Sequence, residues 1–471
     1  MAAKEPPQQT GERPVLGIGM VGYAFMGAAH SQGWRTVGRA FDLPLRPALA
    51  AVCGRDAAAV RAAADQHGWA AAETDWRKLI ARDDVHLVDI CTPGDSHAEI
   101  AIAALEAGKH VLCEKPLANS VAEAEAMAAA AERARARGQL AMVGFNYRRV
   151  PAMAYARRLV AEGRLGALRH VRVCYLQDWL VDPDFPLTWR LEREHAGSGA
   201  LGDLGAHIVD LAQYVAGERL VGVSALSETF VRERPRLVGA SAGLAGADRA
   251  GADAAGRGLT GEGVAAAGVH GAGEPVSPDG LPASEGARRG PVTVDDAVVF
   301  TGRLASGALA SFEATRMAAG RKNALRLELN GERGSLAFDL ERLNELFFHD
   351  HTEPAASAGF RRVLVTEPDH PYLEGWWPPG HALGYEHTFA HQARDLVLAV
   401  AAGTEPSPSF ADGLQVQRVL AAVEHSAADH AAYTPIDGRD LGEGATAARP
   451  VPSPLTTTPP PPPPPSSAVT A

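Results

Sequence analysis

Two short runs of β-branched and other apolar residues each end in a turn that contains proline. Residues 85–91 lead into Thr92-Pro93, and residues 110–113 lead into Glu114-Lys115-Pro116, with apolar residues at helical spacing between the two runs. This strand–helix–strand order predicts the crossover unit of a doubly wound parallel sheet. Ligands bind at the carboxyl ends of the strands in such sheets. The pattern therefore predicts that Lys115 lies at a binding cleft, and a solvated surface lysine is the alternative.

A glycine-rich stretch follows the first apolar run, residues 15–21. The literal G-x-G-x-x-G match begins at Gly17, inside this predicted strand. A second register, with Gly22, Ala24 and Gly27, places the motif between the strand and a following helix. We favour the second register because backbone N–H groups at such a turn can bind a pyrophosphate. Ala24 then stands where the motif usually has its second glycine.

The next predicted strand, residues 48–53, ends in Gly54, Arg55 and Asp56. Dinucleotide-binding folds often carry an acidic residue near this point, which binds the 2′-hydroxyl of the ribose. Here Arg55 could accommodate a 2′-phosphate, and Asp56 could reach a 2′-hydroxyl. The sequence leaves both NAD and NADP open as cofactors, and Arg55 as a plain surface residue is the alternative.

Strand and helix patterns alternate up to about residue 146, which predicts an α/β Rossmann domain with a doubly wound parallel sheet over residues 14–146. Residues 147–440 predict an α+β domain with a large, mainly antiparallel open sheet, in which residues 292–304 and 308–318 form a hairpin.

Three segments have the composition of disordered chain. Residues 235–290 are dominated by Gly, Ala, Ser and Pro and predict a flexible insertion in the second domain. We also expect disorder over residues 1–13 and in the proline-rich tail, residues 441–471, which predicts a polyproline II spacer or a ligand for SH3-like domains.

The overall composition excludes several classes of protein. The 471 residues carry a formal net charge of -11, which argues against a nucleic-acid partner. We expect no membrane span, because no apolar run is long enough, and the polar start without a signal core predicts a cytoplasmic protein. The cysteines lie in apolar runs without zinc-site spacing, which predicts buried, reduced thiols and no metal: Cys53, Cys91, Cys113 and Cys174.

A predicted helix over residues 201–217 carries a second candidate site. Asp203, His207 and Asp210 recur at i, i+4 and i+7 and therefore share one face. A carboxylate one turn from an imidazole suits general acid–base chemistry, because it can orient the ring and adjust its pKa. A capping aspartate with a hydrogen-bonded core histidine is the simpler alternative, and metal ligation by the three residues is a third.

Five blocks of sequence occur together between residues 14 and 437: 20–27 with His30, Cys91-Thr92-Pro93 with His97, 107–111 leading to Glu114-Lys115-Pro116, Asn146-Tyr147-Arg148, and 199–207. In combination they resemble the Gfo/Idh/MocA family of nicotinamide-dependent sugar and polyol dehydrogenases. The resemblance implies hydride transfer between a secondary hydroxyl and NAD or NADP, and a homodimer or homotetramer that pairs through the open sheet.

The resemblance also implies roles for individual residues. Lys115 would bridge cofactor and sugar hydroxyl, His207 would be the general base in oxidation, and Asp203 would orient the substrate or His207. The implied cofactor-binding set is Gly22, Ala24, Phe25, Met26, Gly27, Gly54, Arg55, Thr92, Pro93, His97, Glu114 and Lys115. The implied substrate-binding set is Asn146, Tyr147, Asp178, Arg190, Asp203 and His207.

Several segments narrow the resemblance to a subgroup that oxidises the C3 hydroxyl of an anhydro-glucose with NAD. These are residues 175–179, Trp189-Arg190, 196–199 and 407–413. Two alternatives use the same scaffold: a sugar sensor or regulator that binds NAD(P) without chemistry, and an NAD-dependent glycosidase in which hydride leaves and returns. The joint presence of Lys115, Asp203 and His207 favours the dehydrogenase over the sensor.

Overall fold

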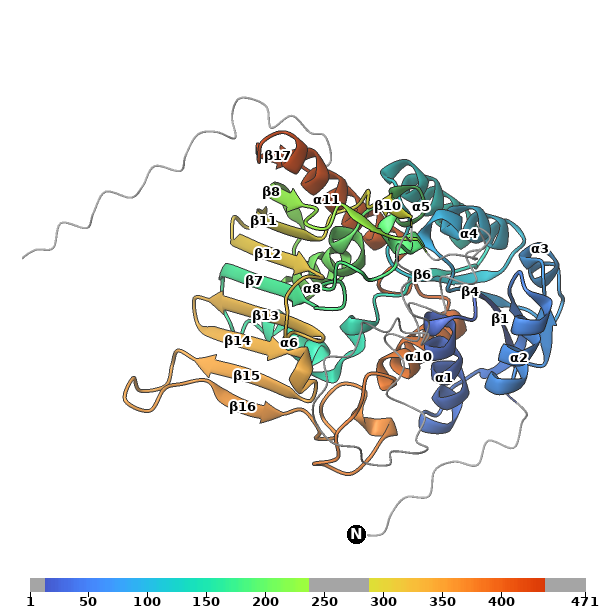
Figure 1. Ribbon diagram of the computed structural model, residues 1–471. Helices are drawn as coiled ribbons and strands as arrows, with labels where there is room; N and C mark the ends of the chain where they lie inside the picture. The colour runs from blue at the N-terminus through green and yellow to red at the C-terminus, as the bar shows by residue number, and fades with distance from the viewer. Residues whose placement is uncertain (1–12, 237–287, 437–471) are drawn as a thin grey trace, which may run out of the picture.

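The computed structural model describes residues 13–236 and 288–436, which contain two large sheets, each flanked by helices, and one two-stranded sheet (Figure 1). In the first sheet every pairing is parallel and the strand order is β3-β2-β1-β4-β5-β6, as in the classical dinucleotide-binding fold. Its strands are β1 (Val15–Val21), β2 (Arg46–Cys53), β3 (Ala71–Glu73), β4 (Leu87–Ile90), β5 (His110–Cys113) and β6 (Ala141–Val143). Its helices are α1 (Phe25–Ala40), α2 (Ala57–His67), α3 (Trp76–Ile80), α4 (His97–Glu106) and α5 (Val121–Arg135).

The second sheet has nine strands in the order β16-β15-β14-β13-β7-β12-β11-β8-β17. All of its pairings are antiparallel except that of β12 with β7, so the predicted mainly antiparallel sheet is confirmed. Its strands are β7 (Leu168–Leu176), β8 (Leu220–Glu228), β11 (Ala297–Leu304), β12 (Leu309–Thr315), β13 (Ala324–Gly331), β14 (Gly334–Asp339), β15 (Glu345–Asp350), β16 (Arg361–Leu364) and β17 (Thr434–Pro435). The predicted hairpin of residues 292–304 and 308–318 corresponds to β11 and β12.

Helices cover one face of the second sheet and connect it to the first (Figure 1). Alternate residues of β11 are buried, and three helices cover this face: α6 (Pro151–Ala161) on β14 and β15, α8 (Ala206–Ala216) on β7 and β13, and α11 (Phe410–Ala428) on β8. The other face of the sheet is open. Helix α10 (His387–Ala402) returns to pack against α1 so closely that a β-carbon at Gly33 would lie 2.8 Å from the Phe389 backbone. The two sheets therefore belong to one packed body.

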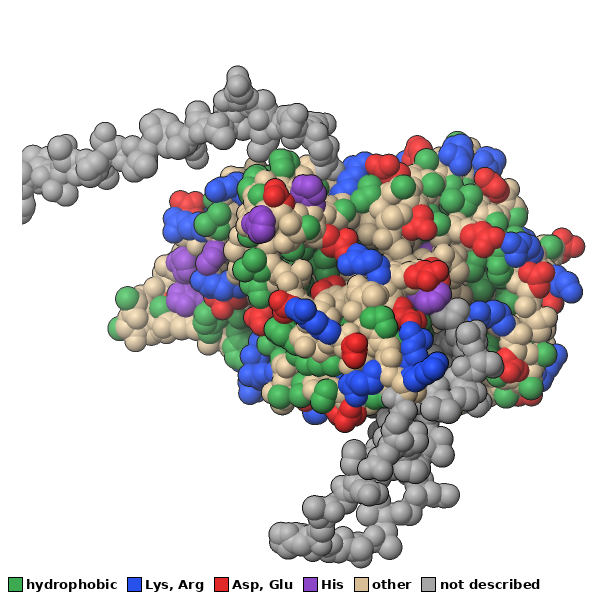
Figure 2. Space-filling view, turned by 45° about the horizontal axis from the view of Figure 1, so that its top comes forward, with side chains coloured by type: hydrophobic (Ala, Val, Ile, Leu, Met, Phe, Trp, Pro, Cys, Tyr) green, Lys and Arg blue, Asp and Glu red, His purple; other side chains and the backbone are tan. Residues whose placement is uncertain are grey.

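The predicted insertion lies almost entirely outside the described residues, as do the two predicted disordered ends. At its borders β9 (Glu233–Pro235) pairs antiparallel with β10 (Arg289–Pro291), so the segment leaves and re-enters the fold at one place. Within the described ranges no helix has the length and apolar character to span a membrane. Figure 2 shows acidic and basic side chains interspersed over the face that it displays.

A buried histidine on α10 makes stability sensitive to acid. His391 is fully buried, and its Nε2 accepts a 2.7 Å hydrogen bond from the indole of Trp376, so the neutral ring uses Nδ1 to donate to the carbonyl of Arg149 at 2.8 Å. Burial, together with the charges of His387 and Arg394, lowers its pKa to about 3, against a backbone hydrogen bond that raises it.

We therefore expect acid to destabilise the wild type more than the His391→Gln variant. The unfolded chain binds a proton near pH 6.5 and the folded chain only near pH 3, so stability falls as pH drops between these values, by about 1.4 kcal/mol per unit at most. Thermal unfolding from pH 7 to pH 4 measures the effect: the Tm of His391→Gln should fall less steeply. Parallel Tm curves for the two proteins would contradict the assignment.

Candidate active site

The glycine-rich turn lies between β1 and α1, in the register of Gly22, Ala24 and Gly27. Gly22 has φ +100°, and a β-carbon there would lie 2.7 Å from the carbonyl oxygen of Cys91. A β-carbon at Gly27 would lie 2.3 Å from the oxygen of Gly22, so both positions need glycine. Ala24 is the N-cap of α1 and makes no side-chain cap, which leaves the first N–H groups of the helix to a ligand. The turn therefore fits a pyrophosphate, with Phe25 and Met26 in the first helical turn beside it.

The loops after β4 and β5 lie at the same edge of the sheet as the glycine-rich turn, and His97 fastens them together. Its Nε2 lies 2.9 Å from the carbonyl oxygen of Thr92, and its Nδ1 lies 3.1 Å from that of Pro116. The ring is 1% exposed. His97 holds Thr92-Pro93 and Pro116 together at one edge of the sheet, and its place beside the cofactor stays a prediction.

Glu114 is buried, and both of its carboxylate oxygens have partners within the protein. One carboxylate oxygen lies 2.9 Å from Nε2 of His30, and the other accepts the backbone N–H of Lys115 at 3.1 Å. Nδ1 of His30 lies 2.9 Å from the carboxylate of Asp89, which also accepts the indole N–H of Trp34 at 2.7 Å. Burial disfavours the imidazolium, but the attraction of Asp89 raises the pKa of His30 well above its usual range. A buried cation between two carboxylates thus supports the backbone of Lys115.

Lys115 meets Asp203 where the two domains face one another. Its Nζ donates to the backbone oxygen and to Oδ1 of Asp203, both at 2.9 Å. Burial raises the pKa of the Asp203 carboxyl, but the cations of Lys115, Arg190 and Arg316 together bring it well below its ordinary value. Asp203 is therefore ionised, and it fixes the ammonium group of Lys115 with two of that group's three N–H bonds.

His207 lies on α8, one turn after Asp203, in a pocket of aromatic rings. Its ring centroid is 4.6 Å from that of Tyr147, 6.0 Å from Tyr175 and 6.1 Å from Phe145. Burial and the charge of Lys115 lower the pKa of His207 well below its usual value, against the opposing attraction of Asp203. Its buried Nδ1 has no hydrogen-bond partner among the described residues. A neutral imidazole with an unused nitrogen can accept a proton from a ligand.

The helix that carries these residues differs from the regular helix expected over 201–217. Leu201–Gly205 forms a π-helical turn, and α8 starts only at Ala206. Asp203 bonds Lys115 instead of pairing with His207, and Asp210 is held by Arg148, whose Nε lies 2.8 Å from its carboxylate. Asp210 therefore has a structural role. In the described part of the chain the three residues do not form a metal-binding group.

A chain of hydrogen bonds extends the site into the second domain. The hydroxyls of Tyr147 and Tyr175 lie 2.7 Å apart, and that of Tyr175 donates to Oδ1 of Asn323 at 2.7 Å. Asn323 also accepts from Gln177 at 2.8 Å, and Gln177 accepts from the indole of Trp179 at 3.0 Å. Of this group the sequence predicted only Tyr147 as a substrate-binding residue, although Tyr175, Gln177 and Trp179 lie in the segment 175–179 that narrowed the resemblance. The period-two spacing of Tyr175 and Gln177 on a predicted strand was the available signal, and Asn323 had none.

The remaining expected substrate residues lie at unequal distances from this centre. Asn146 donates to Oγ1 of Thr388 at 2.9 Å, which connects it to α10. The guanidinium of Arg190 lies 4.5 Å from the ring centroid of Trp189, and its positive charge helps to lower the pKa of Asp203. The carboxylate of Asp178 instead accepts from Lys322 at 2.8 Å and from the backbone of Gly320, so it faces a loop rather than the aromatic pocket.

Comparisons with known proteins cover both of these domains. A family model described as the GFO/IDH/MocA C-terminal domain matches residues 153–337, and one described as the oxidoreductase family, NAD-binding Rossmann fold, matches residues 16–145. Levoglucosan dehydrogenase of Pseudarthrobacter phenanthrenivorans is 41% identical over 415 residues, which cover 88% of this chain and 96% of the relative. The chain belongs to the Gfo/Idh/MocA family. As the family description states, it is an oxidoreductase with an NAD-binding domain.

Solved structures of similar proteins confirm the fold of this Gfo/Idh/MocA protein. An oxidoreductase domain protein from Kribbella flavida has 59% sequence identity and a TM-score of 0.78, and the match covers 90% of this chain and 99% of that one. A levoglucosan dehydrogenase in complex with NADH and levoglucosan has 37% identity and a TM-score of 0.76, covering 90% and 100%. The predicted fold class is thus confirmed, and so is NAD as a cofactor of the family.

Proposed function

We propose that this protein is an NAD-dependent dehydrogenase that oxidises a secondary hydroxyl of a sugar. The observation that carries the proposal is the convergence of Lys115 from the first domain and His207 from the second around Asp203. The resemblance to levoglucosan dehydrogenases supports a pyranose-sized substrate. The hydroxyl and amide groups of Tyr147, Gln177 and Asn323 offer the donors and acceptors that a sugar requires.

The residues present divide the chemistry between them. Hydride can leave a carbinol carbon only if its hydroxyl proton is taken up, and the neutral imidazole of His207 is the base placed to accept it. The third N–H of Lys115 is left to donate to the same oxygen and to stabilise its developing negative charge. Asp203 orients that ammonium group. Bound NAD supplies the nicotinamide ring that accepts the hydride.

A panel of sugars tests the proposal directly. Purified protein, NAD and each sugar, with levoglucosan, glucosides and inositols included, should show net formation of reduced nicotinamide by absorbance with at least one of them. Binding of nucleotide without turnover on any sugar would favour the sensor. Cleavage of a glycoside without net reduction would favour the glycosidase. The named dehydrogenases among the relatives favour neither alternative.

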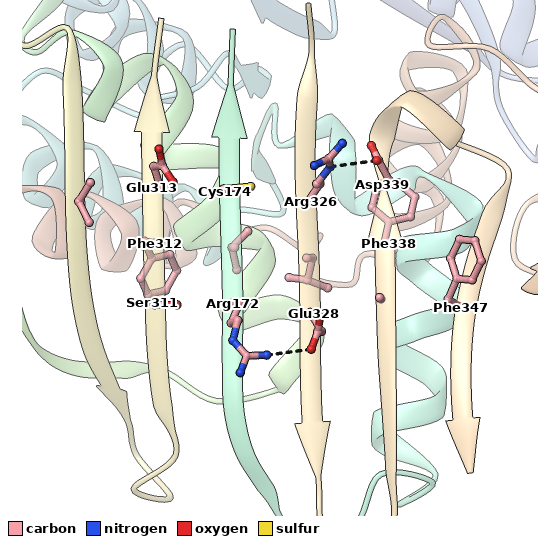
Figure 3. A pocket seen from close by; sticks show the side chains of 14 residues that line it. Arg172, Cys174, Ser311, Phe312, Glu313, Arg326, Glu328, Phe338, Asp339 and Phe347 are labelled. Carbon is pink, nitrogen blue, oxygen red and sulfur yellow. Dashed lines mark hydrogen bonds and ion pairs between the residues drawn. The ribbon is translucent and has the colours of Figure 1, made fainter. Parts of the chain in front are cut away.

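The protein is also proposed to work as a homo-oligomer that pairs through the open face of the second sheet. This face contains a hollow of about 550 Å³, and ion pairs such as Arg172–Glu328 and Arg326–Asp339 lie across it (Figure 3). Val299 lines this hollow, and it and its cross-strand neighbour Leu226 have 54% and 65% of their surface exposed. Exposed apolar residues on a sheet face favour a protein interface. The free cysteines support the cytoplasm as its location.

Charges placed on this face should separate the subunits. The double variant Leu226→Asp, Val299→Asp is expected to elute as a monomer where the wild type elutes as a dimer or tetramer, because a stable interface buries about 1,600 Å² of complementary surface. Light scattering after size exclusion gives the masses. Val181→Asp, at an exposed valine outside the sheet, is the control and should keep the wild-type mass. Equal masses for all three proteins would contradict pairing through this face.

A further inference from the structure

The π-helical turn at Leu201–Gly205 determines where the ammonium group of Lys115 lies. Asp203, in the middle of this turn, accepts two hydrogen bonds from that group, one of them through its backbone oxygen. A backbone oxygen moves only with the turn itself, so the position of Nζ depends on the position of the turn. π-Helical turns are rare in proteins and occur frequently at functional sites. The contacts that hold this turn in place therefore bear on the chemistry of Lys115.

Asp295, in the loop before β11, holds the start of this turn with three hydrogen bonds. Its Oδ1 accepts the backbone N–H of Gly199 at 2.7 Å, and its Oδ2 accepts that of Leu201 at 2.8 Å. Its backbone oxygen accepts the N–H of Ala200 at 3.0 Å. The first N–H groups of a helix have no partners within the helix. A single residue that is distant in the sequence therefore satisfies three successive N–H groups at the start of the turn.

The contact of Asp295 with the turn is close, and hydrogen bonds connect it to Asp203. A β-carbon at Gly199 would lie 1.8 Å from the backbone oxygen of Asp295, so this approach requires glycine. The oxygen of Gly199 in turn accepts the N–H of Asp203 at 3.0 Å. The buried guanidinium of Arg316 donates to the same oxygen of Asp295 at 2.9 Å. A continuous set of hydrogen bonds thus runs from Asp295 through the turn to Lys115.

We infer that Asp295 is a positioning residue for sugar oxidation: it holds the turn so that Asp203 directs the third N–H of Lys115 at the substrate oxygen. The inference rests on the proposed function, because it concerns the same reaction. A displacement of about 1 Å at a reacting centre can lower a rate by about a hundredfold. The contribution of Asp295 should therefore appear in kcat rather than in the binding of NAD.

The neighbouring Asp296 provides a matched control. It is fully buried, and its Oδ2 accepts two backbone N–H groups, that of Phe230 at 2.8 Å and that of Val231 at 3.0 Å. These two residues follow β8 and are not part of the turn that carries Asp203. Asp296→Asn thus removes the same charge as Asp295→Asn and disturbs a comparable pair of hydrogen bonds, but leaves the turn in place.

Kinetics of these two variants test the inference. The amide of Asp295→Asn has one acceptor oxygen where the carboxylate has two, so one backbone N–H of the turn loses its partner. We expect kcat for the best sugar of the panel to fall by about tenfold to a hundredfold, with the Kd for NAD unchanged. Asp296→Asn should lower the Tm at least as much, because its site is more deeply buried, and should keep the wild-type kcat. The same kcat in both variants would overturn the inference.

The loss should also depend on Lys115. If Asp295 acts on the rate through the ammonium group of Lys115, adding Asp295→Asn to the Lys115→Met protein should lower kcat by less than about twofold. Independent effects would multiply instead. A further loss of about tenfold in the double variant would therefore overturn the inference, because it would show that Asp295 acts without Lys115.

Crystal structures of the single variants separate failure of this inference from failure of the proposed function. In Asp295→Asn the distance from Nζ of Lys115 to the backbone oxygen of Asp203 should exceed about 3.5 Å, the limit of a hydrogen bond. In Asp296→Asn it should remain near 2.9 Å. An unchanged distance in Asp295→Asn would overturn the inference even in an active enzyme. A protein that oxidises no sugar would refute the proposed function, and the two distances would still decide whether Asp295 positions Lys115.

Discussion

Replacing Lys115 by methionine is expected to lower kcat for sugar oxidation by about a thousandfold, because a preorganised cation at a developing oxyanion contributes on that order. Methionine keeps most of the length and the apolar stem of the side chain, and removes the charge together with its N–H donors. The substitution also leaves Asp203 without its closest cation, so the pKa of that carboxyl should rise from its lowered value. Steady-state kinetics with NAD and the best sugar of the panel measure the loss.

Nucleotide binding separates this effect from misfolding. Lys115→Met should bind NAD and unfold near the wild-type temperature, since the backbone of residue 115 is still held by Glu114. Lys78→Met, at an exposed lysine of α3, provides the matched control and should keep wild-type kcat. A Lys115→Met protein with kcat within about tenfold of wild type would remove Lys115 from the chemistry.

Replacing His207 by asparagine is expected to lower kcat/KM by about a hundredfold to ten-thousandfold, the usual range for a general base. The wild-type rate should rise with pH through the pKa of His207 and then level, because only the neutral ring accepts a proton. Burial and Lys115 lower that pKa, so the acid limb lies well below pH 6.5. The variant should lack this limb.

The pH profile of kcat/KM distinguishes a base from a residue that only packs. A packing residue changes the rate equally at every pH, whereas loss of the base removes the acid limb. His381→Asn, at an exposed histidine of the loop before α10, is the control and should keep the whole wild-type profile. An unchanged acid limb in His207→Asn would show that another group titrates there.

Local patterns predicted the first domain well, because each of its parts is encoded within a few residues. The turn at Gly22 and the β4–α4–β5 unit needed only strand and helix periodicity with glycine or proline at the ends. The pairing of strands that lie far apart in the chain could not be predicted from the sequence. β12 lies parallel to β7 although more than a hundred residues separate them, and nothing in either strand specifies its neighbour. The π-helical turn at 201–205 was also hidden, since a five-residue turn leaves the apolar pattern almost intact.

The same contrast between local patterns and long-range contacts applies to the candidate active site. Motifs identified Lys115 and His207 as chemically suitable residues, but a motif does not give the direction of a side chain. The buried positions of His97 and Glu114 and the contact of Asp178 with Lys322 depend on hydrogen-bond partners in the loop after β4, in α1 and in the loop before β13. Asn323 was missed because the fold alone brings it to Tyr175.

The buried contacts of His30 with Asp89 and Glu114 restrict how these residues can change in evolution. The three residues come from α1, β4 and the end of β5, and each balances the charge of another in the interior. A single replacement at any of them leaves a buried charge without its partner, which lowers the stability of the folded protein strongly. We expect the three residues to be substituted together in evolution, so that aligned homologous sequences would differ at all three positions or at none.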